Sequence, residues 1–322
     1  QEDGQTALEV RLTERIGEAG ARVHLGRSRN DQVLVAIRLY VRDVVAEISA
    51  AADAVADALV ALAARQADVA LPGYTHMQQA MPSSVDWWAR GFAAEIRDDA
   101  LGIRQTLRRI DRCPLGSAAG YGTPNLPISR EATRKRLGFA EVHEPVTAVQ
   151  LSRGKAESQL LFEITLLMQD LGRLAADILL FYTREFAFVE LPESMTTGSS
   201  IMPQKRNPDV LDLIRGRSAT ALACLVEALG ICSRLPSGYH RDLQLLKAPL
   251  FRGIDVCAQV LSILPPALEG LRFRPENIRL EPDIAAAARA NELVVRERLS
   301  FRDAYRKVAD EIQRDKQGGR KP

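Results

Sequence analysis

The forty residues from 32 to 71 contain neither glycine nor proline, and no other feature of the sequence constrains the fold as strongly. Apolar residues recur there at intervals of three and four, from "QVLVAIRLYVRDVVAEI" to "ARQADVAL". This spacing places apolar side chains on one side of an α-helix. The pattern therefore predicts a single long helix over residues 32–71.

Further long helical patterns cover residues 83–112, 150–190, 208–234 and 241–264, whereas the alternation typical of strands is scarce. Helices of this length are unusual, since the average helix has about 11–12 residues. They are typical of a helical bundle or of a core that several chains share. We therefore predict an all-α fold made of a long-helix bundle.

The predicted helix 32–71 is apolar on most of its faces. A helix that is apolar nearly all round is buried, which favours helices shared in an oligomeric core. An ordinary central helix buried within a monomer is the alternative. The residues concerned are Val41, Val44, Val45, Ile48, Ala51, Ala52, Val55, Ala56 and Leu59.

Length and composition exclude several classes of protein. The chain has 322 residues, so we expect two domains or one elongated domain. Its net charge of +2 gives no reason to expect nucleic acid or a membrane as partner, and no apolar run approaches the roughly 20 residues of a membrane helix. The four cysteines and four histidines form no CxxC or HxxxH pair. We therefore expect no metal site, no disulfide framework and a reducing, cytoplasmic location.

Polar connectors between the helices contain the residues best suited to chemistry. The clearest is "TTGSSIMPQKRNPD", residues 196–209. Asn207, Pro208 and Asp209 are typical of a helix start, with Asn207 as its cap. Lys205 lies just before this start, whose free N–H groups attract anions. Together with the hydroxyl groups, these residues predict a carboxylate or phosphate site; a plain flexible loop is the alternative.

Two other connectors add complementary groups. "RSRND" (27–31) supplies Arg27, Arg29 and Asn30 at the start of the first long helix, and arginine binds carboxylates through paired hydrogen bonds. "GYTH" (73–76) supplies His76, the residue type best suited to proton transfer near neutral pH. Each alone could be an ordinary surface residue. Together they predict a substrate that carries two negative charges.

These motifs carry a family resemblance. "GSSIMPQKRNP" (198–208) resembles the signature loop of the fumarase/aspartase superfamily. "HLGRSRNDQV" (24–33), "LPGYTHMQQAMP" (71–82) and "PLGSAAGYG" (114–122) resemble the argininosuccinate lyase family within it, and the similarity runs from "EDGQTALE" (2–9) to about residue 315. Family members extend further at both ends. The resemblance therefore implies the remainder of an N-terminal helical domain over 1–28, a central long-helix bundle over 29–275 and the start of a small C-terminal helical domain over 276–322.

The resemblance also implies a reaction. It is the reversible anti-elimination of argininosuccinate to arginine and fumarate in arginine biosynthesis, with no cofactor and no metal. Ser199 would be the base that removes a proton next to a substrate carboxylate, and Lys205 and Asn207 would stabilise the doubly charged aci-carboxylate. His76, with Thr75, would help protonate the leaving nitrogen.

The remaining site residues follow from the same resemblance. Asp212 would orient His76. Binding of the substrate would fall to Arg29 and Asn30, which hold its succinyl part, and to Arg153, Tyr239, Gln244 and Lys247.

Three positions depart from the family pattern. The family often has His where this chain has Gln5, and usually Glu where it has Asp212. It usually has an acid-Arg-Asp cluster where this chain reads "VQLSRGKAE" around Arg153. These departures leave room for a lyase acting on another N-substituted aspartate. A catalytically silent, crystallin-like structural homologue is the alternative from a different class.

The length of the first helix predicts that the site is shared between chains. Forty residues of helix span roughly 60 Å at about 1.5 Å each. "RSRND" lies at the start of this helix and "GYTH" just past its end, with no Gly or Pro to break it. The family implies a homotetramer in which Ser199 and His76 come from different neighbouring chains.

Overall fold

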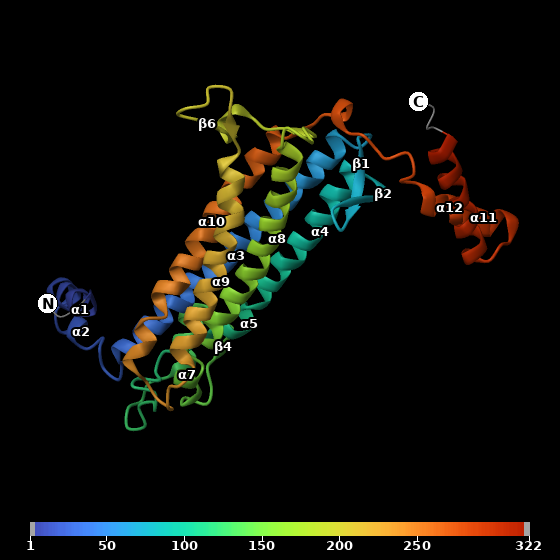
Figure 1. Ribbon diagram of the computed structural model, residues 1–322. Helices are drawn as coiled ribbons and strands as arrows, with labels where there is room; N and C mark the ends of the chain where they lie inside the picture. The colour runs from blue at the N-terminus through green and yellow to red at the C-terminus, as the bar shows by residue number, and fades with distance from the viewer. Residues whose placement is uncertain (1–3, 319–322) are drawn as a thin grey trace. The chain divides into compact units, whose positions relative to one another are not determined.

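The computed structural model describes residues 4–318 and consists mainly of helices (Figure 1). This confirms the all-α prediction. The α-helices are α1 (Gly4–Ile16), α2 (Glu18–Ala21), α3 (Arg29–Arg65), α4 (Val85–Gln105), α5 (Leu107–Ile110), α6 (Arg130–Leu137), α7 (Ala148–Leu151), α8 (Lys155–Tyr182), α9 (Asp209–Cys232), α10 (Lys247–Gly270), α11 (Ala286–Glu297) and α12 (Phe301–Gly318).

The strands are short and form four two-stranded sheets among the described residues. The sheets pair β1 (Ala70–Thr75) with β2 (Gln78–Ser84), β3 (Arg112–Cys113) with β4 (Glu141–Val142), β5 (Val189–Glu190) with β8 (Arg272–Phe273), and β6 (Thr197–Gly198) with β7 (Arg206–Asn207). Three 3₁₀ turns add η1 (Glu193–Met195), η2 (Arg241–Gln244) and η3 (Pro275–Asn277).

The first long helix is shorter at its end than the sequence predicted. α3 stops at Arg65, and Ala70–Thr75 form the first strand of a hairpin. Leu71 precedes Pro72, and the residue before a proline is disfavoured in helical conformation. The prediction of one helix over residues 32–71 is therefore wrong for residues 66–71, about a turn and a half.

Other helix boundaries also differ from the prediction, and the structure gives a physical reason for two of them. The helix predicted over 150–190 is broken near its start, because Gly154 has a positive φ of 85° and an added Cβ there would lie 2.3 Å from the Cys232 sulfur. The helix predicted to end at 264 continues through Pro265 and Pro266 to Gly270. Its next turn buries Ala267 and Leu268, and this burial outweighs the cost of the two prolines.

The chain divides into two compact units. One comprises Gln1–Val55, Glu95–Ala175 and Asp212–Leu264, and the other Ala56–Ala94, Ala176–Leu211 and Pro265–Pro322. The domain limits predicted at residues 28 and 275 stay predictions.

The core of the first unit consists of long helices packed through aliphatic side chains. Most of the apolar face residues of α3 are fully buried there by other parts of the same chain, including Val45 and Ala52 at 0% exposure. Their burial is what a central helix requires, so the apolar character of α3 gives no argument for an oligomeric core. The alternative reading, an ordinary buried central helix, describes α3 itself.

The second unit is held together by aromatic packing. Trp88 contacts Phe92, Phe181 and Phe273 edge-on, and its indole N–H donates to Asp177 at 2.9 Å. In the same unit α11 and α12 form a helical hairpin (Figure 1) around its own small apolar cluster, which contains Ala290, Leu293, Ala304 and Val308.

One described segment, Arg241–Gly270, is long and apolar enough to meet the length and composition of a membrane span. Half of that window is buried inside the protein, as in the core helix of a soluble bundle. The expectation that no apolar run approaches this length was therefore too strict.

Candidate active site

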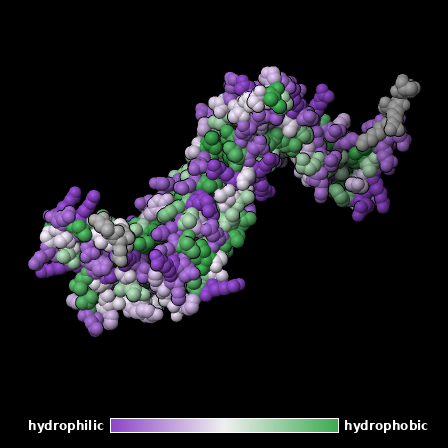
Figure 2. Space-filling model, turned by 60° about the vertical axis from the view of Figure 1, so that its left-hand side comes forward, coloured by the Kyte–Doolittle hydropathy of each residue, from purple (hydrophilic) through white to green (hydrophobic). Residues whose placement is uncertain are grey.

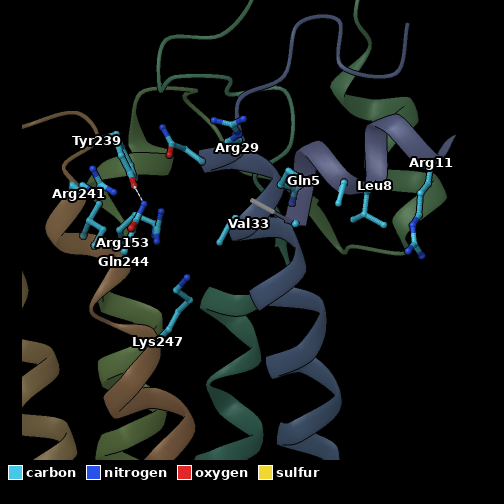
Figure 3. Close-up of a pocket in the computed structure, with 14 residues that line it drawn as sticks. Gln5, Leu8, Arg11, Arg29, Val33, Arg153, Tyr239, Arg241, Gln244 and Lys247 are labelled. Atoms are coloured by element: carbon cyan, nitrogen blue, oxygen red, sulfur yellow. Dashed lines mark hydrogen bonds between the residues drawn. The ribbon is translucent and has the colours of Figure 1, made fainter. Parts of the chain in front are cut away.

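A cavity of about 1130 Å³ in the first unit collects six of the residues predicted to bind the substrate (Figure 3). They come from segments far apart in the sequence: the start of α3, the residues before α8, and the stretch around η2 and the start of α10. Helix α1 contributes further lining residues, Gln5 and Leu8 among them. The six predicted residues are Arg29, Asn30, Arg153, Tyr239, Gln244 and Lys247.

The charge of this cavity suits an anionic ligand. Arg11, Arg29, Arg153, Arg241 and Lys247 line it, and its described lining includes no Asp or Glu. Cations gathered without carboxylates favour a substrate with more than one negative charge. The sequence had singled out neither Arg11 nor Arg241.

Arg153 is the most buried of these cations, at 8% exposure. Its Nε is buried and has no hydrogen-bond partner among the described residues. A buried guanidinium nitrogen without a partner is costly, and a carboxylate ligand would satisfy it. The substrate-binding role of Arg153 stays a prediction, at a position where the surrounding sequence departs from the family pattern.

Local hydrogen bonds hold other members of this cavity in place. Gln244 donates from its side-chain amide to the Tyr239 hydroxyl at 3.2 Å (Figure 3). Arg29 donates to the Thr6 hydroxyl at 3.0 Å, which ties the start of α3 to α1.

Asp31, which sequence reasoning missed, fixes the start of α3. Its carboxylate accepts from the backbone N–H of Ser28 at 2.9 Å, and from those of Gly116 and Ala118 at 3.0 and 2.9 Å. It therefore joins the "RSRND" motif to "PLGSAAGYG", two connectors separated by more than 80 positions. An acid in the first turn of a helix was the signal available in the sequence.

His76 lies in the second unit, at the tip of the β1–β2 hairpin. Thr75 pairs with Gln78, so His76 and Met77 form a two-residue turn with φ values of 53° and 60°. Two left-handed residues define the hairpin turn that normally uses Asn-Gly. The backbone conformation is costly for such side chains, and strain of this kind clusters at functional sites. His76 and Thr75 are exposed.

The signature loop belongs to the same unit and is closed at its base by β6 and β7. Thr197 pairs with Asn207 and Gly198 with Arg206. Inside the loop, the Ser199 hydroxyl oxygen accepts from the backbone N–H groups of Met202 at 3.1 Å and Ile201 at 3.4 Å. Donors aimed at this oxygen favour its anionic form, as a serine base requires.

Lys205 and Asn207 lie in the same loop as Ser199, but Asn207 is not the helix cap that the sequence predicted. α9 begins at Asp209, one position later than expected, and Asn207 belongs to β7. Its side-chain amide donates instead to the Gly198 carbonyl at 3.5 Å. The Thr197 hydroxyl donates to Asp209 across the same base of the loop.

Asp212 is half-exposed on α9 and forms an ion pair with Arg215 at 3.0 Å. Its pairing with His76 stays a prediction. The roles assigned to Ser199, His76, Lys205 and Asn207 stay predictions as well. No group of three His, Cys, Asp or Glu side chains suited to a metal is present among the described residues.

Comparison with known proteins identifies the class. Residues 1–222 match a protein family described as lyase. The helical bundle is also that of known lyases: an EDDS lyase in complex with formate superposes with a TM-score of 0.86 at 26% identity, over 99% of this chain and 64% of that chain. Fold and motifs together define a lyase of the fumarase/aspartase type.

Curated relatives narrow the class further. The argininosuccinate lyase of Sorangium cellulosum is 50% identical over 97% of this chain and 72% of its own length, and that of Xylella fastidiosa strain Temecula1 is 44% identical over 98% and 71%. The chain belongs to the argininosuccinate lyase family and is a carbon–nitrogen lyase. It spans less than two thirds of the EDDS lyase chain.

Proposed function

We propose that this chain cleaves argininosuccinate to arginine and fumarate, as one subunit of a cytoplasmic homotetramer that serves arginine biosynthesis. The observation that carries the proposal is the cationic cavity, where six of the residues predicted to bind the substrate meet. The family membership supports the same substrate. The four free cysteines, three of them buried, support a reducing location.

In the proposed reaction, Ser199 removes a proton from the carbon beside a substrate carboxylate, and the C–N bond breaks on the opposite face. The N–H groups of Ile201 and Met202 stabilise the serine oxygen as it gains negative charge. Lys205 and Asn207 stabilise the aci-carboxylate, and His76 supports protonation of the leaving guanidinium nitrogen. The cationic cavity holds the carboxylates of the succinyl part.

The helix length supports sites shared between subunits. α3 is an unbroken helix of 37 residues, about 55 Å long. Arg29 is its first residue, and His76 follows its end. A single chain with this helix cannot bring both side chains to one small substrate, so we propose that His76 and Ser199 reach the cavity of a neighbouring subunit.

Exposed apolar side chains support assembly. Leu222, Val226 and Leu229 share one face of α9, and Phe162 and Leu166 share one face of α8. They are between 37% and 60% exposed, and Figure 2 shows apolar side chains at the surface among the polar ones. Apolar surface on several helices of one unit is typical of a protein interface.

The test is incubation of the purified protein with argininosuccinate while the ultraviolet absorbance of fumarate is followed. Fumarate and arginine should appear in equal amounts. Absence of fumarate from a folded, assembled protein would contradict the proposal. Turnover of another N-substituted aspartate would then favour the alternative substrate. The structural similarity to EDDS lyase is consistent with that alternative.

A further inference from the structure

A second cavity of about 580 Å³ lies in the first unit and is not used by the proposed reaction. Residues of α3, of the α4–α5 region, and of α7 and the start of α8 line it. Five of them are cations, Arg38, Arg108, Arg109, Arg112 and Lys155, and none of the described lining residues is Asp or Glu. Ligand pockets typically have about 300–1,000 Å³, so the cavity has room for a small metabolite.

Arg38 is a fixed, buried positive charge on the wall of this cavity, at 4% exposure. It donates to the Arg112 carbonyl, to His143 Nδ1 at 3.0 Å and to the Ser152 hydroxyl at 3.1 Å. All three acceptors are neutral. Burial lowers the pKa of Arg38 to about 10, although the nearby carboxylate of Glu157 opposes this. The guanidinium therefore stays charged at neutral pH, with no carboxylate bonded to it in these contacts.

His143, which lies beside Arg38, is neutral. Burial, followed by the charges of Arg38, Arg112 and Arg130, lowers the pKa of His143 to about 3. Its Nδ1 must therefore be an acceptor toward Arg38, which leaves the cavity's positive charge to the arginines and Lys155.

Two buried polar atoms of the lining are unsatisfied. Arg112 Nε and Gln159 Oε1 have no hydrogen-bond partner among the described residues. The nearest carboxylate oxygen to Arg112 Nε is that of Glu141, at 3.6 Å, which is too long for a good hydrogen bond. A 180° flip of the Gln159 side-chain amide exchanges its oxygen and nitrogen, so that its N–H groups occupy the position of the unsatisfied oxygen. Both groups can thus donate to a ligand oxygen.

The rim of the cavity is also cationic. Arg108, Arg109 and Lys155 are exposed, and the described part of the chain offers them no ion pair. Guanidinium groups bind phosphate oxygens through pairs of parallel hydrogen bonds. From these contacts we infer that the cavity binds a small oxyanion with at least two negative charges, of which a phosphate group fits the donors best.

This cavity is separate from the candidate active site. Arg153 lines the active-site cavity, whereas Ser152 and Lys155 line the second one. Neighbouring positions of one short segment therefore serve the two cavities. The inference is independent of the proposed reaction, since it concerns binding alone.

The test measures binding of inorganic phosphate and of pyrophosphate by calorimetry to the full chain, at constant ionic strength with chloride as the balancing anion. Arg108→Gln combined with Lys155→Gln removes two exposed rim charges without disturbing the core. We expect at least tenfold weaker binding in this double variant. Tighter binding of pyrophosphate than of phosphate would show that the site takes more than one phosphoryl group.

Two controls locate the bound anion. Arg136→Gln removes an exposed charge of α6 that lines neither cavity, and Lys247→Gln removes a charge from the active-site cavity. Arg136→Gln should bind phosphate as the parent does, and Lys247→Gln should retain the binding that the rim double variant loses. The inference is overturned if the parent binds neither anion, if the rim double variant binds as tightly as the parent, or if Lys247→Gln alone abolishes binding.

Discussion

Ser199 combines two properties that its proposed role demands. It is only partly buried, so a substrate can reach it, and two backbone N–H groups point at its oxygen. A serine hydroxyl is far too weak an acid to ionise alone at neutral pH. The loop geometry supplies part of the stabilisation, and Lys205 from the same loop supplies charge.

Replacing this hydroxyl should stop catalysis and spare binding. We expect Ser199→Ala to lower kcat by about 10²–10⁴-fold, the usual contribution of a proton-transfer group, while the affinity for argininosuccinate stays close to that of the parent. Steady-state kinetics and calorimetric titration measure the two quantities. Ser194→Ala, an exposed serine of η1, should keep parent activity. Near-normal turnover of the Ser199 variant would show that the base lies elsewhere.

Asp99 makes stability depend on pH for reasons unrelated to the active site. Burial, followed by the negative charges of four neighbouring carboxylates, raises the pKa of its carboxyl group to about 7; the four are Asp170, Asp98, Glu163 and Glu95. One of its oxygens is buried without a partner among the described residues. The folded state therefore binds a proton that the unfolded chain releases above pH 3.8, so this group's contribution to stability falls as pH rises from about 4 to 7.

The variant Asp99→Asn removes this dependence. We expect its melting temperature to exceed that of the parent at pH 8, and the difference to shrink at pH 5, where the parent carboxyl group is already protonated. Thermal unfolding followed by circular dichroism at the two pH values provides the measurement. Asp43→Asn, at an exposed position of α3, reports the effect of charge removal alone. A constant difference between Asp99→Asn and the parent at both pH values would contradict this account.

At the scale of elements, two glutamines tie the second unit together in the same way. Gln79 of β2 donates to the Arg279 carbonyl and accepts from the Glu281 N–H, both at 2.9 Å. Gln66, just after α3, donates to the Leu271 carbonyl at 3.3 Å and accepts from the Phe273 N–H at 2.6 Å. Each side-chain amide thus pairs with a backbone segment some 200 residues later. Gln79 differs from Gln66 in its location, because its hydrogen bonds fix the β1–β2 hairpin, whose tip carries His76.

We therefore expect Gln79 to position His76. Gln79→Leu removes both hydrogen bonds and should lower kcat about tenfold, the effect of roughly 1.4 kcal/mol, with a much smaller change in KM. Gln79→Asn, whose shorter amide retains the same groups, should recover part of the loss. Steady-state kinetics of both variants gives the measurement.

Gln66→Leu is the matched control for this prediction. It removes an equivalent pair of hydrogen bonds from the same unit, so it should lower the melting temperature as much as Gln79→Leu does and leave kcat unchanged. If the two variants lose kcat equally, the hairpin brace acts on stability alone.

Secondary-structure elements could be predicted from the sequence where neighbouring residues alone determine them. The long helices were recognisable because apolar spacing and the absence of Gly and Pro are local signals. The end of α3 was misplaced, since the hairpin beyond it uses His76 and Met77 in a turn that normally needs Asn-Gly. The first-turn position of Asp31 was a local signal for its helix, but its partners Gly116 and Ala118 lie about 85 positions away. The partners of Gln79 lie about 200 positions away, and no local pattern reports contacts over such distances.

At the scale of the whole molecule, the burial of α3 changes the reason for expecting an oligomer. Its apolar faces are satisfied within one chain. Assembly is favoured instead by the exposed apolar faces of α8 and α9 and by the length of α3. With the family resemblance, they lead to the prediction that Ser199 and His76 of one site come from different chains.

Mixing two inactive variants tests that claim. Ser199→Ala and His76→Asn should each be inactive alone, because each lacks a group that every site needs. When the two proteins are unfolded together and refolded as a mixture, the proposed tetramer should form with subunits of both kinds. If the two residues of one site come from different chains, some sites receive an intact copy of both, and fumarate production should return to part of the parent level.

The controls are refolding of each variant alone, which should give no activity, and refolding of the parent, which defines full recovery. Native mass spectrometry of the refolded mixture establishes that tetramers containing both variants are present. Recovery requires only that Ser199 and His76 be supplied by separate chains, since a site that takes both from one chain is always defective in these mixtures. Mixed tetramers without activity would therefore place both residues of a site on the same chain. Because the roughly 55 Å of α3 separates His76 from Arg29 of its own chain, that chain would then have to be a neighbour of the one whose Arg29 holds the substrate.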